Sequence, residues 1–245
     1  MPTATRDGVS LYYETEGSGE GVAFVAEAGL GAWSWGWQHR AVAGPYRALV
    51  YDHRGTGRSD APEGPYTVDE LAADLRAVVR DAGLGRPHLV GLGLGGMVAL
   101  RYAREYGART LTLAGTAASG DRADTDALVD ADEADLLSSA FRAANPEVVA
   151  GIAEWRAEED AAPDARRAQA AAVSGFEAGP LYEVTAPALV VHGGSDAVVP
   201  VEAGRALAAD LPGGEVHTFD GAGHLVTVER SRPVNDRLVG HLEGG

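Results

Sequence analysis

The sequence predicts an α/β protein with a mainly parallel, doubly wound sheet and a helical insertion. Three observations lead to this fold class. Short apolar runs typical of buried strands alternate with amphipathic helices along most of the chain. That alternation stops between about residues 120 and 182, where helical patterns alone are found. The length of 245 residues suits one such domain with an insertion.

The first half of the chain contains the clearest elements. We expect strands at residues 9–15, 21–26 and 46–52. A glycine-containing loop leads from the second of these strands into a short helix. The segment 66–84 has apolar residues at helical spacing, and Thr67 can cap its first turn. A strand at 87–91, a helix at 95–107 and a strand at 109–115 continue the alternation.

The second half begins with the insertion. We expect helices around 125–143, 146–159 and 163–174. A strand within 186–196, a helix near 201–211, a strand at 215–220 and a last helix near 229–242 then resume the alternation. This predicts a core made of residues 1–119 and 183–245, with residues 120–182 as a helical lid.

The composition narrows the class of partner. The net charge is −16, and all twenty basic residues are arginine. Without a basic face, binding to nucleic acid or to an anionic membrane is disfavoured, so a small molecule is the expected partner. Acidic residues dispersed along a lysine-free chain are typical of a halophilic cytoplasmic protein, because high salt screens their mutual repulsion; the alternative is a soluble acidic protein from a GC-rich genome.

The same composition bears on the location of the protein. There is no cysteine, which excludes disulfides and thiolate chemistry. The N-terminal residues lack the pattern of a signal peptide, and no apolar run approaches the ~18 residues that a membrane span needs. We expect a soluble, cytoplasmic protein, while its oligomeric state stays open.

The stretch HLVGLGLGGMVALRYA, residues 88–103, runs from a strand through a glycine turn into a helix. Gly91, Gly93 and Gly96 spell the G-x-G-x-x-G of dinucleotide-binding folds. That motif should follow the first strand of its unit, and an acidic residue should end the next strand. Here the stretch lies deep in the chain, and the next strand, RTLTLAG, has no acidic residue at its end. Both tests fail.

The same stretch also fits a nucleophile elbow, G-x-S-x-G, with Gly93 at the place of the serine. In such enzymes an acid and then a histidine follow the nucleophile in chain order. Asp196 lies just after a buried strand, in VVHGGSDAVVP, and His224 follows the next strand, in DGAGHLV. Both lie in loops at the carboxyl edge of the predicted sheet, where open α/β folds place their sites.

These segments resemble the α/β-hydrolase superfamily, especially its lidded members of the 3-oxoadipate enol-lactonase and meta-cleavage C–C hydrolase type. The resemblance rests on AGLGAWSW, YDHRGTGRSD, VGLGLGGMVALRYA, GGSDAVVP and GAGHLV, and covers nearly the whole chain outside the lid. It implies the α/β-hydrolase fold. It also implies that Asp196 orients His224 and that the backbone amides of Leu30 and Leu94 are the two oxyanion donors.

The chain departs from the family pattern at two places. The elbow serine is Gly93, and the His-Gly before the oxyanion loop is Ala28-Gly29, preceded by Glu27. Glycine cannot form an acyl-enzyme, so covalent catalysis at residue 93 is excluded. Two altered elements together favour natural divergence over the engineered removal of one side chain.

We therefore expect an enzyme without a serine nucleophile, in which His224 and Asp196 form an acid/base dyad. It would act on a small ester, lactone or activated carbonyl compound beneath the lid, with no cofactor and no metal. Two alternatives stay open: a retired hydrolase that only binds a small molecule, and a cofactor-free lyase or isomerase. Glu27 is either a pocket carboxylate or the partner of an arginine, and Trp33 either lines the pocket or packs a helix.

Overall fold

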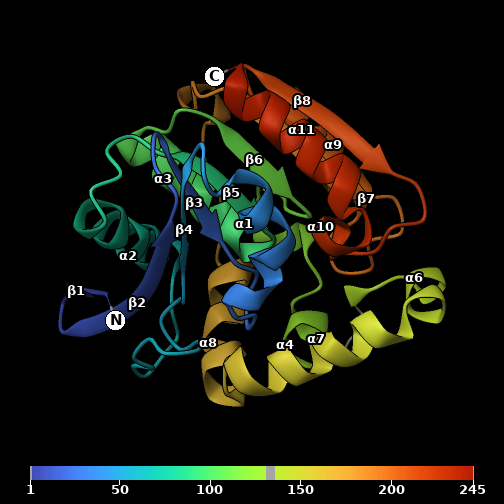
Figure 1. Cartoon of the computed structure of the whole chain (residues 1–245), viewed down its shortest axis with the longest axis horizontal. Coiled ribbons are helices and arrows are strands. Elements are labelled where there is room, and N and C mark those ends of the chain that lie inside the picture. Colours follow the sequence, from blue (N-terminus) through green and yellow to red (C-terminus); the bar gives the residue numbers. More distant parts are fainter. Residues whose placement is uncertain (1, 131–135, 245) are drawn as a thin grey trace.

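A computed structural model of the chain describes residues 2–130 and 136–244. A central sheet lies at its core, with helices around it (Figure 1). The strand order is β1-β2-β4-β3-β5-β6-β7-β8. The strands are β1 (Thr3–Arg6), β2 (Val9–Glu16), β3 (Gly21–Val25), β4 (Arg47–Tyr51), β5 (His88–Leu92), β6 (Leu111–Ala114), β7 (Ala188–Gly193) and β8 (Gly214–Phe219). The five pairings from β4 to β8 in this order are parallel, whereas β1 pairs with β2, and β2 with β4, in antiparallel fashion. The predicted α/β fold is confirmed.

Helices connect the strands much as the sequence predicts. These are α1 (Gly36–Val42) after the 3-10 turn η1 (Ala32–Trp35), α2 (Val68–Asp81), α3 (Leu94–Tyr106), α9 (Val201–Asp210), α10 (Val226–Glu229) and α11 (Ser231–Glu243). Thr67 caps α2 as predicted, since its side chain accepts the Glu70 amide while the Glu70 carboxylate accepts the Thr67 amide. The sequence did not predict β1, because its four residues TATR show no apolar run.

The segment between β6 and β7 is helical, as predicted. It contains η2 (Gly120–Arg122), α4 (Thr125–Asp130), α6 (Ser139–Ala144), α7 (Pro146–Glu159), α8 (Pro163–Ser174) and η3 (Leu181–Glu183). Of the helix predicted around 125–143, residues 131–135 lie outside the described residues. In Figure 1 the yellow and orange helices α7 and α8 lie below the sheet. Their role as a lid stays a prediction.

The sheet has one change of direction that matters for the site. The chain passes from β3 to its neighbour β4, then returns across β3 to β5 and continues outward to β8. In open α/β sheets, ligands bind at such a switch point, outside the carboxyl ends of the strands. Val25 of β3 lies opposite Gly91 of β5. Residues 27 and 93, each two positions further on, therefore leave the sheet side by side.

Most of the sheet is covered on both faces. All residues of β3, β5, β6 and β7 are buried, and they are mainly apolar. Over the described ranges 2–130 and 136–244, no helix combines the length and the apolar character that crossing a bilayer requires.

Candidate active site at the strand ends

The turn between β5 and α3 holds Gly93 in an unusual backbone conformation. Its φ is +52° and its ψ is −113°, a region that strains any residue with a side chain. Its carbonyl oxygen accepts a hydrogen bond from the Thr116 hydroxyl at 2.7 Å. The turn has the strand-to-helix form expected of a nucleophile elbow, and glycine adopts it without the strain.

The two residues expected to form a dyad lie in hydrogen-bond contact. His224 Nδ1 lies 2.9 Å from Oδ2 of Asp196 and 3.0 Å from its Oδ1. The backbone amides of Val198 and Val199 each donate to Oδ1 of Asp196 at 2.9 Å. These amides fix the carboxylate, which in turn fixes the orientation of the imidazole ring.

A second histidine supports the same carboxylate. His192, buried on β7, places Nε2 3.2 Å from Oδ2 of Asp196. The sequence alone did not assign His192 to the site. The available signal was its position four residues before Asp196 at the end of the same strand segment.

Glu27 completes the constellation from the other side of His224. Its Oε2 lies 2.7 Å from His224 Nε2. Its Oε1 accepts the Leu94 amide at 2.8 Å and the Ala28 amide at 2.5 Å. Glu27 is 1% exposed and His224 0%. The partners of Glu27 are thus a histidine and backbone amides, and not the arginine that was one of the two possibilities.

The carboxylate of Glu27 fills the space that a side chain at residue 93 would need. A Cβ atom built on Gly93 would lie 1.4 Å from Oε2 of Glu27. The two departures from the family pattern are therefore one structural change. The glutamate brings a carboxylate to the elbow, and only glycine leaves room for it.

The charges of these groups set the protonation of His224. Burial alone would lower the pKa of the imidazole, but Asp196 and Glu27 attract and hydrogen-bond the charged form and raise the pKa to about 10. Burial would likewise raise the pKa of Asp196, but His224 and His192 hold it well below its usual range. At neutral pH, His224 is an imidazolium that donates Nδ1–H to Asp196 and Nε2–H to Glu27.

One expected oxyanion donor lies elsewhere. The Leu30 amide donates to the backbone carbonyl oxygen of Glu27 at 3.1 Å, because the loop after β3 turns tightly there. The amides of Ala28 and Leu94 donate to the same oxygen of Glu27. Both amides are bonded to the Glu27 carboxylate, so the expected oxyanion hole is filled by a side chain of the protein itself.

The loop after β3 is hydrogen-bonded to Gln169 of α8. Gln169 is fully buried, and its Oε1 accepts the Gly29 amide at 2.6 Å. Its Nε2 donates at 2.8 Å to both the Arg54 carbonyl oxygen and the Thr56 hydroxyl. Gln169 thereby positions the segment that carries Glu27. Nothing in the alanine-rich sequence around residue 169 marks it for this role.

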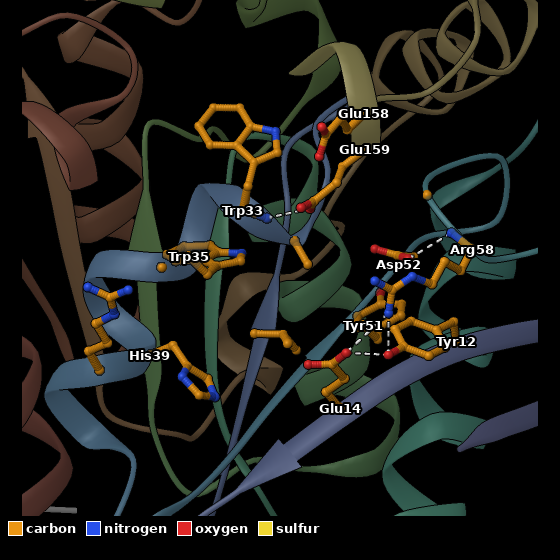
Figure 2. Close-up of a pocket in the computed structure, with 15 residues that line it drawn as sticks. Tyr12, Glu14, Trp33, Trp35, His39, Tyr51, Asp52, Arg58, Glu158 and Glu159 are labelled. Carbon is orange, nitrogen blue, oxygen red and sulfur yellow. Dashed lines mark hydrogen bonds and ion pairs between the residues drawn. The ribbon is translucent and has the colours of Figure 1, made fainter. Parts of the chain in front are cut away.

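Trp33 lies in η1, which follows the same loop. Its amide donates to Glu159 at 3.0 Å, and its Nε1 donates to Asp160 at 2.8 Å. It lines a cavity of about 450 Å³ to which neither Glu27 nor His224 contributes (Figure 2). Other residues of this cavity are Glu14, Trp35, Tyr51, Asp52 and Glu159. Trp33 thus combines packing with the lining of a pocket that His224 and Asp196 do not line.

Within the described ranges, no cluster of three or more histidine, aspartate or glutamate side chains could hold a metal ion. The five groups that do converge are Gly93, Leu94, Glu27, Asp196 and His224. They provide an imidazolium, a carboxylate in contact with it, and a second carboxylate behind it.

Comparison with known proteins agrees with this architecture. Residues 22–237 match the model of the alpha/beta hydrolase family. The chain is 30% identical to a protein of Caulobacter segnis that bears the name "Putative carbamate hydrolase RutD", in an alignment that covers all of both chains. A shorter alignment to the RutD protein of Azorhizobium caulinodans is 37% identical over 103 residues and spans 39% of that protein.

Solved structures show the same fold. The enol-lactonase of Burkholderia xenovorans superimposes with a TM-score of 0.87 at 24% identity, over 99% of this chain and all of that one. A thermophilic esterase from Thermogutta terrifontis superimposes with a TM-score of 0.85 at 26% identity, over 99% and 96% of the two chains.

Proposed function

Since the chain belongs to the alpha/beta hydrolase family, we propose that it is an enzyme acting on a small molecule with an activated carbonyl group, and that His224 and Asp196 are its acid/base dyad. Esters, lactones and carbamates are the substrate classes to test, because similar proteins carry names of this kind. The observation that carries the proposal is the orientation of His224. Its Nδ1 lies on Asp196, and its Nε2 points at the elbow.

The charge of His224 defines its first task. An imidazolium in contact with a substrate oxygen donates a proton or a strong hydrogen bond as charge develops on that oxygen. This requires no nucleophile at residue 93. Catalysis of this kind contributes roughly 10²–10⁴-fold to a rate.

The experiment compares the protein with His224→Ala on p-nitrophenyl acetate, γ-butyrolactone, phenyl carbamate and the enolisable ketone acetylacetone. His217→Ala is the matched control, since His217 lies partly exposed on β8 outside the site. We expect turnover of at least one compound, a fall of ~100-fold or more in His224→Ala, and no change in His217→Ala. Equal activity in both variants would refute the role of His224.

A second candidate is a retired hydrolase that binds a small molecule without turnover. The observation that favours it is the Glu27 carboxylate, which occupies the amides that stabilise an oxyanion in related enzymes. Calorimetric titration with the same compounds separates the two. Saturable binding with no product from any compound supports the binder and excludes the enzyme.

A further inference from the structure

The acid/base dyad has a third member that the family pattern does not contain. Glu27 reaches the elbow from the end of β3, and its Oε2 contacts His224 Nε2 at 2.7 Å. Oε2 also lies 1.4 Å from the position of a Cβ on residue 93. A carboxylate oxygen therefore faces the histidine at the place of a serine side chain.

The hydrogen bonds of Glu27 limit the chemistry available to the site. Addition to a carbonyl group creates an oxyanion, which needs donors placed in advance. The amides of Ala28 and Leu94 are already bonded to Oε1 of Glu27. The Nε2–H of His224 donates to the other oxygen, Oε2, so a substrate that displaces this one hydrogen bond meets a proton donor and a carboxylate oxygen together. Acyl transfer is therefore poorly supported here, whereas a reaction that needs one proton donor and one proton acceptor is well supported.

We propose that Glu27 is the catalytic base of a proton-shift reaction on an enolisable carbonyl compound, with His224 as the paired acid. This deepens the proposed function above and rests on it. Oε2 of Glu27 removes a proton from the carbon next to the carbonyl group, and the C–H electron pair becomes the C=C bond of the enol. The π electrons of the carbonyl bond move to oxygen, which takes the proton from Nε2.

That step leaves a neutral imidazole beside a protonated carboxyl group. The proton on Oε2 then moves to Nε2 across their 2.7 Å contact, which restores both groups. Atoms and charges balance, and the net result is conversion of a keto compound to its enol. When the enol is conjugated with a second C=C bond, the reverse step at the far carbon of this dienol returns the proton there, and the double bond has moved along the substrate.

The dimensions of the pair fit this exchange. The carbonyl oxygen and the neighbouring carbon of a ketone lie about 2.4 Å apart, for bonds of about 1.52 and 1.23 Å. Nε2 and Oε2 are 2.7 Å apart in their mutual hydrogen bond, a separation close to that of the two substrate atoms, so each can meet one of them once the substrate replaces that bond. The atom that takes a proton from the substrate, Oε2, and the atom that gives one to it, Nε2, are thus neighbours in the protein.

Burial of the pair also favours an internal exchange. Glu27 and His224 are almost completely shielded from solvent, as is Asp196, which stabilises the imidazolium from behind. A hydrolase must admit water to the reacting carbon. A proton shift consumes no water, and exclusion of water strengthens each interaction among the three charges.

The test is exchange of carbon-bound hydrogen for deuterium. Acetylacetone and phenylpyruvate are incubated with the protein in D₂O, and loss of the proton signal next to the carbonyl group is followed by NMR. Glu27→Gln keeps the size of the side chain and removes the base. Glu27→Asp keeps the base but shortens its reach. Glu63→Gln, on an exposed loop, is the matched control.

We expect the protein to accelerate exchange, Glu27→Gln to lose ~100-fold or more of that acceleration, and Glu27→Asp to keep part of it. Glu63→Gln should match the unsubstituted protein. Urea unfolding of each variant verifies that it is folded. A primary isotope effect on exchange, present in the protein and absent from the residual rate of Glu27→Gln, would support Glu27 as the group that takes the proton.

Two results would overturn the inference. One is exchange that is as fast in Glu27→Gln as in the unsubstituted protein. The other is hydrolysis of an ester or lactone that depends on His224 without any acceleration of exchange, a result that leaves the proposed function standing. Failure of the proposed function has a different signature, in which no compound is turned over or exchanged by any variant.

Discussion

At the scale of single residues, the site depends on a pair of positions that must be considered together. Gly93 and Glu27 are 66 residues apart in the sequence, yet the carboxylate of one occupies the side-chain space of the other. Either departure from the family pattern looks like a loss when taken alone. Together they exchange a hydroxyl group on the elbow for a carboxylate delivered by the adjacent strand.

We predict that Gly93→Ser destabilises the protein by about 3 kcal/mol or more. Strain at this backbone conformation costs ~1–3 kcal/mol, and displacing the carboxylate leaves buried amides unbonded at ~1–3 kcal/mol each. Urea unfolding measures the loss. Gly83→Ser is the matched control, because Gly83 also has a positive φ, +66°, but has nothing within 4 Å of its Cβ position.

The double variant Glu27→Ala/Gly93→Ser should recover part of that loss, since the collision is gone. Residues in direct contact show coupling of about 0.5–3 kcal/mol in such cycles. If Gly93→Ser were no worse than Gly83→Ser, the carboxylate would not occupy the position that the structure gives it.

A second prediction concerns His224. Its folded-state pKa of about 10 lies above the value of about 6.5 in an unfolded chain. Its contribution to stability is therefore complete below about pH 6.5 and is lost as the pH rises through about 10. NMR of the imidazole should show both nitrogens protonated at pH 7, with deprotonation near pH 10. Any reaction that uses His224 as an acid should decline over the same range.

Glu27→Gln should lower the pKa of His224, because one of its two neighbouring carboxylates is then neutral. Glu63→Gln should leave it unchanged. A neutral imidazole at pH 7 in the unsubstituted protein would contradict the assignment of His224 as an acid.

At the scale of elements, the end of α7 and the start of α8 fasten the loop after β3. Asp160 accepts the Gly31 amide at 3.1 Å and lies within ion-pair distance of Arg156 and Arg166. The Ala161 amide donates to the Gly29 carbonyl oxygen at 2.9 Å. These bonds join the insertion to the segment that carries Glu27.

We predict that Gln169→Leu loosens this connection. The change leaves the Gly29 amide and the Arg54 carbonyl oxygen without their buried partner, at a cost of about 3 kcal/mol in the free energy of unfolding. Hydrogen exchange should become faster at the amides of residues 27–33. Asp164→Ala, on the exposed face of the same helix, should change stability by less than about 0.5 kcal/mol. Unchanged exchange in Gln169→Leu would show that α8 does not hold the loop.

At the scale of the whole molecule, the sheet and most helices could be predicted from the sequence. Buried parallel strands leave apolar runs of four to six residues, and α7 and α8 begin and end where their patterns do. Gly93, Asp196 and His224 were found because each follows a strand within a short motif. The contact between Glu27 and His224 was not found, because it depends on the register of β3 against β5. The role of Gln169 joins residues 140 positions apart, and no local pattern records it.

The charge of the molecule leads to a fourth prediction. With a net charge of −16, mutual repulsion destabilises the folded state at low ionic strength. Raising KCl from 0.05 to 1 M shortens the screening length from over ~10 Å to ~3 Å. A gain on the order of 1 kcal/mol would raise the melting temperature by about 2–4 °C. Sucrose at equal osmolality is the control, and a fall in melting temperature with KCl would contradict the prediction.

The collision between residues 27 and 93 also fixes an order of events in the past of this protein. A glutamate arriving at position 27 while a serine still stood at position 93 would have found its place taken. On any route of single substitutions from a serine at position 93, the serine would have to be replaced before the glutamate could take its place. Once the glutamate had settled against His224, a lone return to serine became a damaging step. Single substitutions can therefore produce this arrangement more easily than they can reverse it.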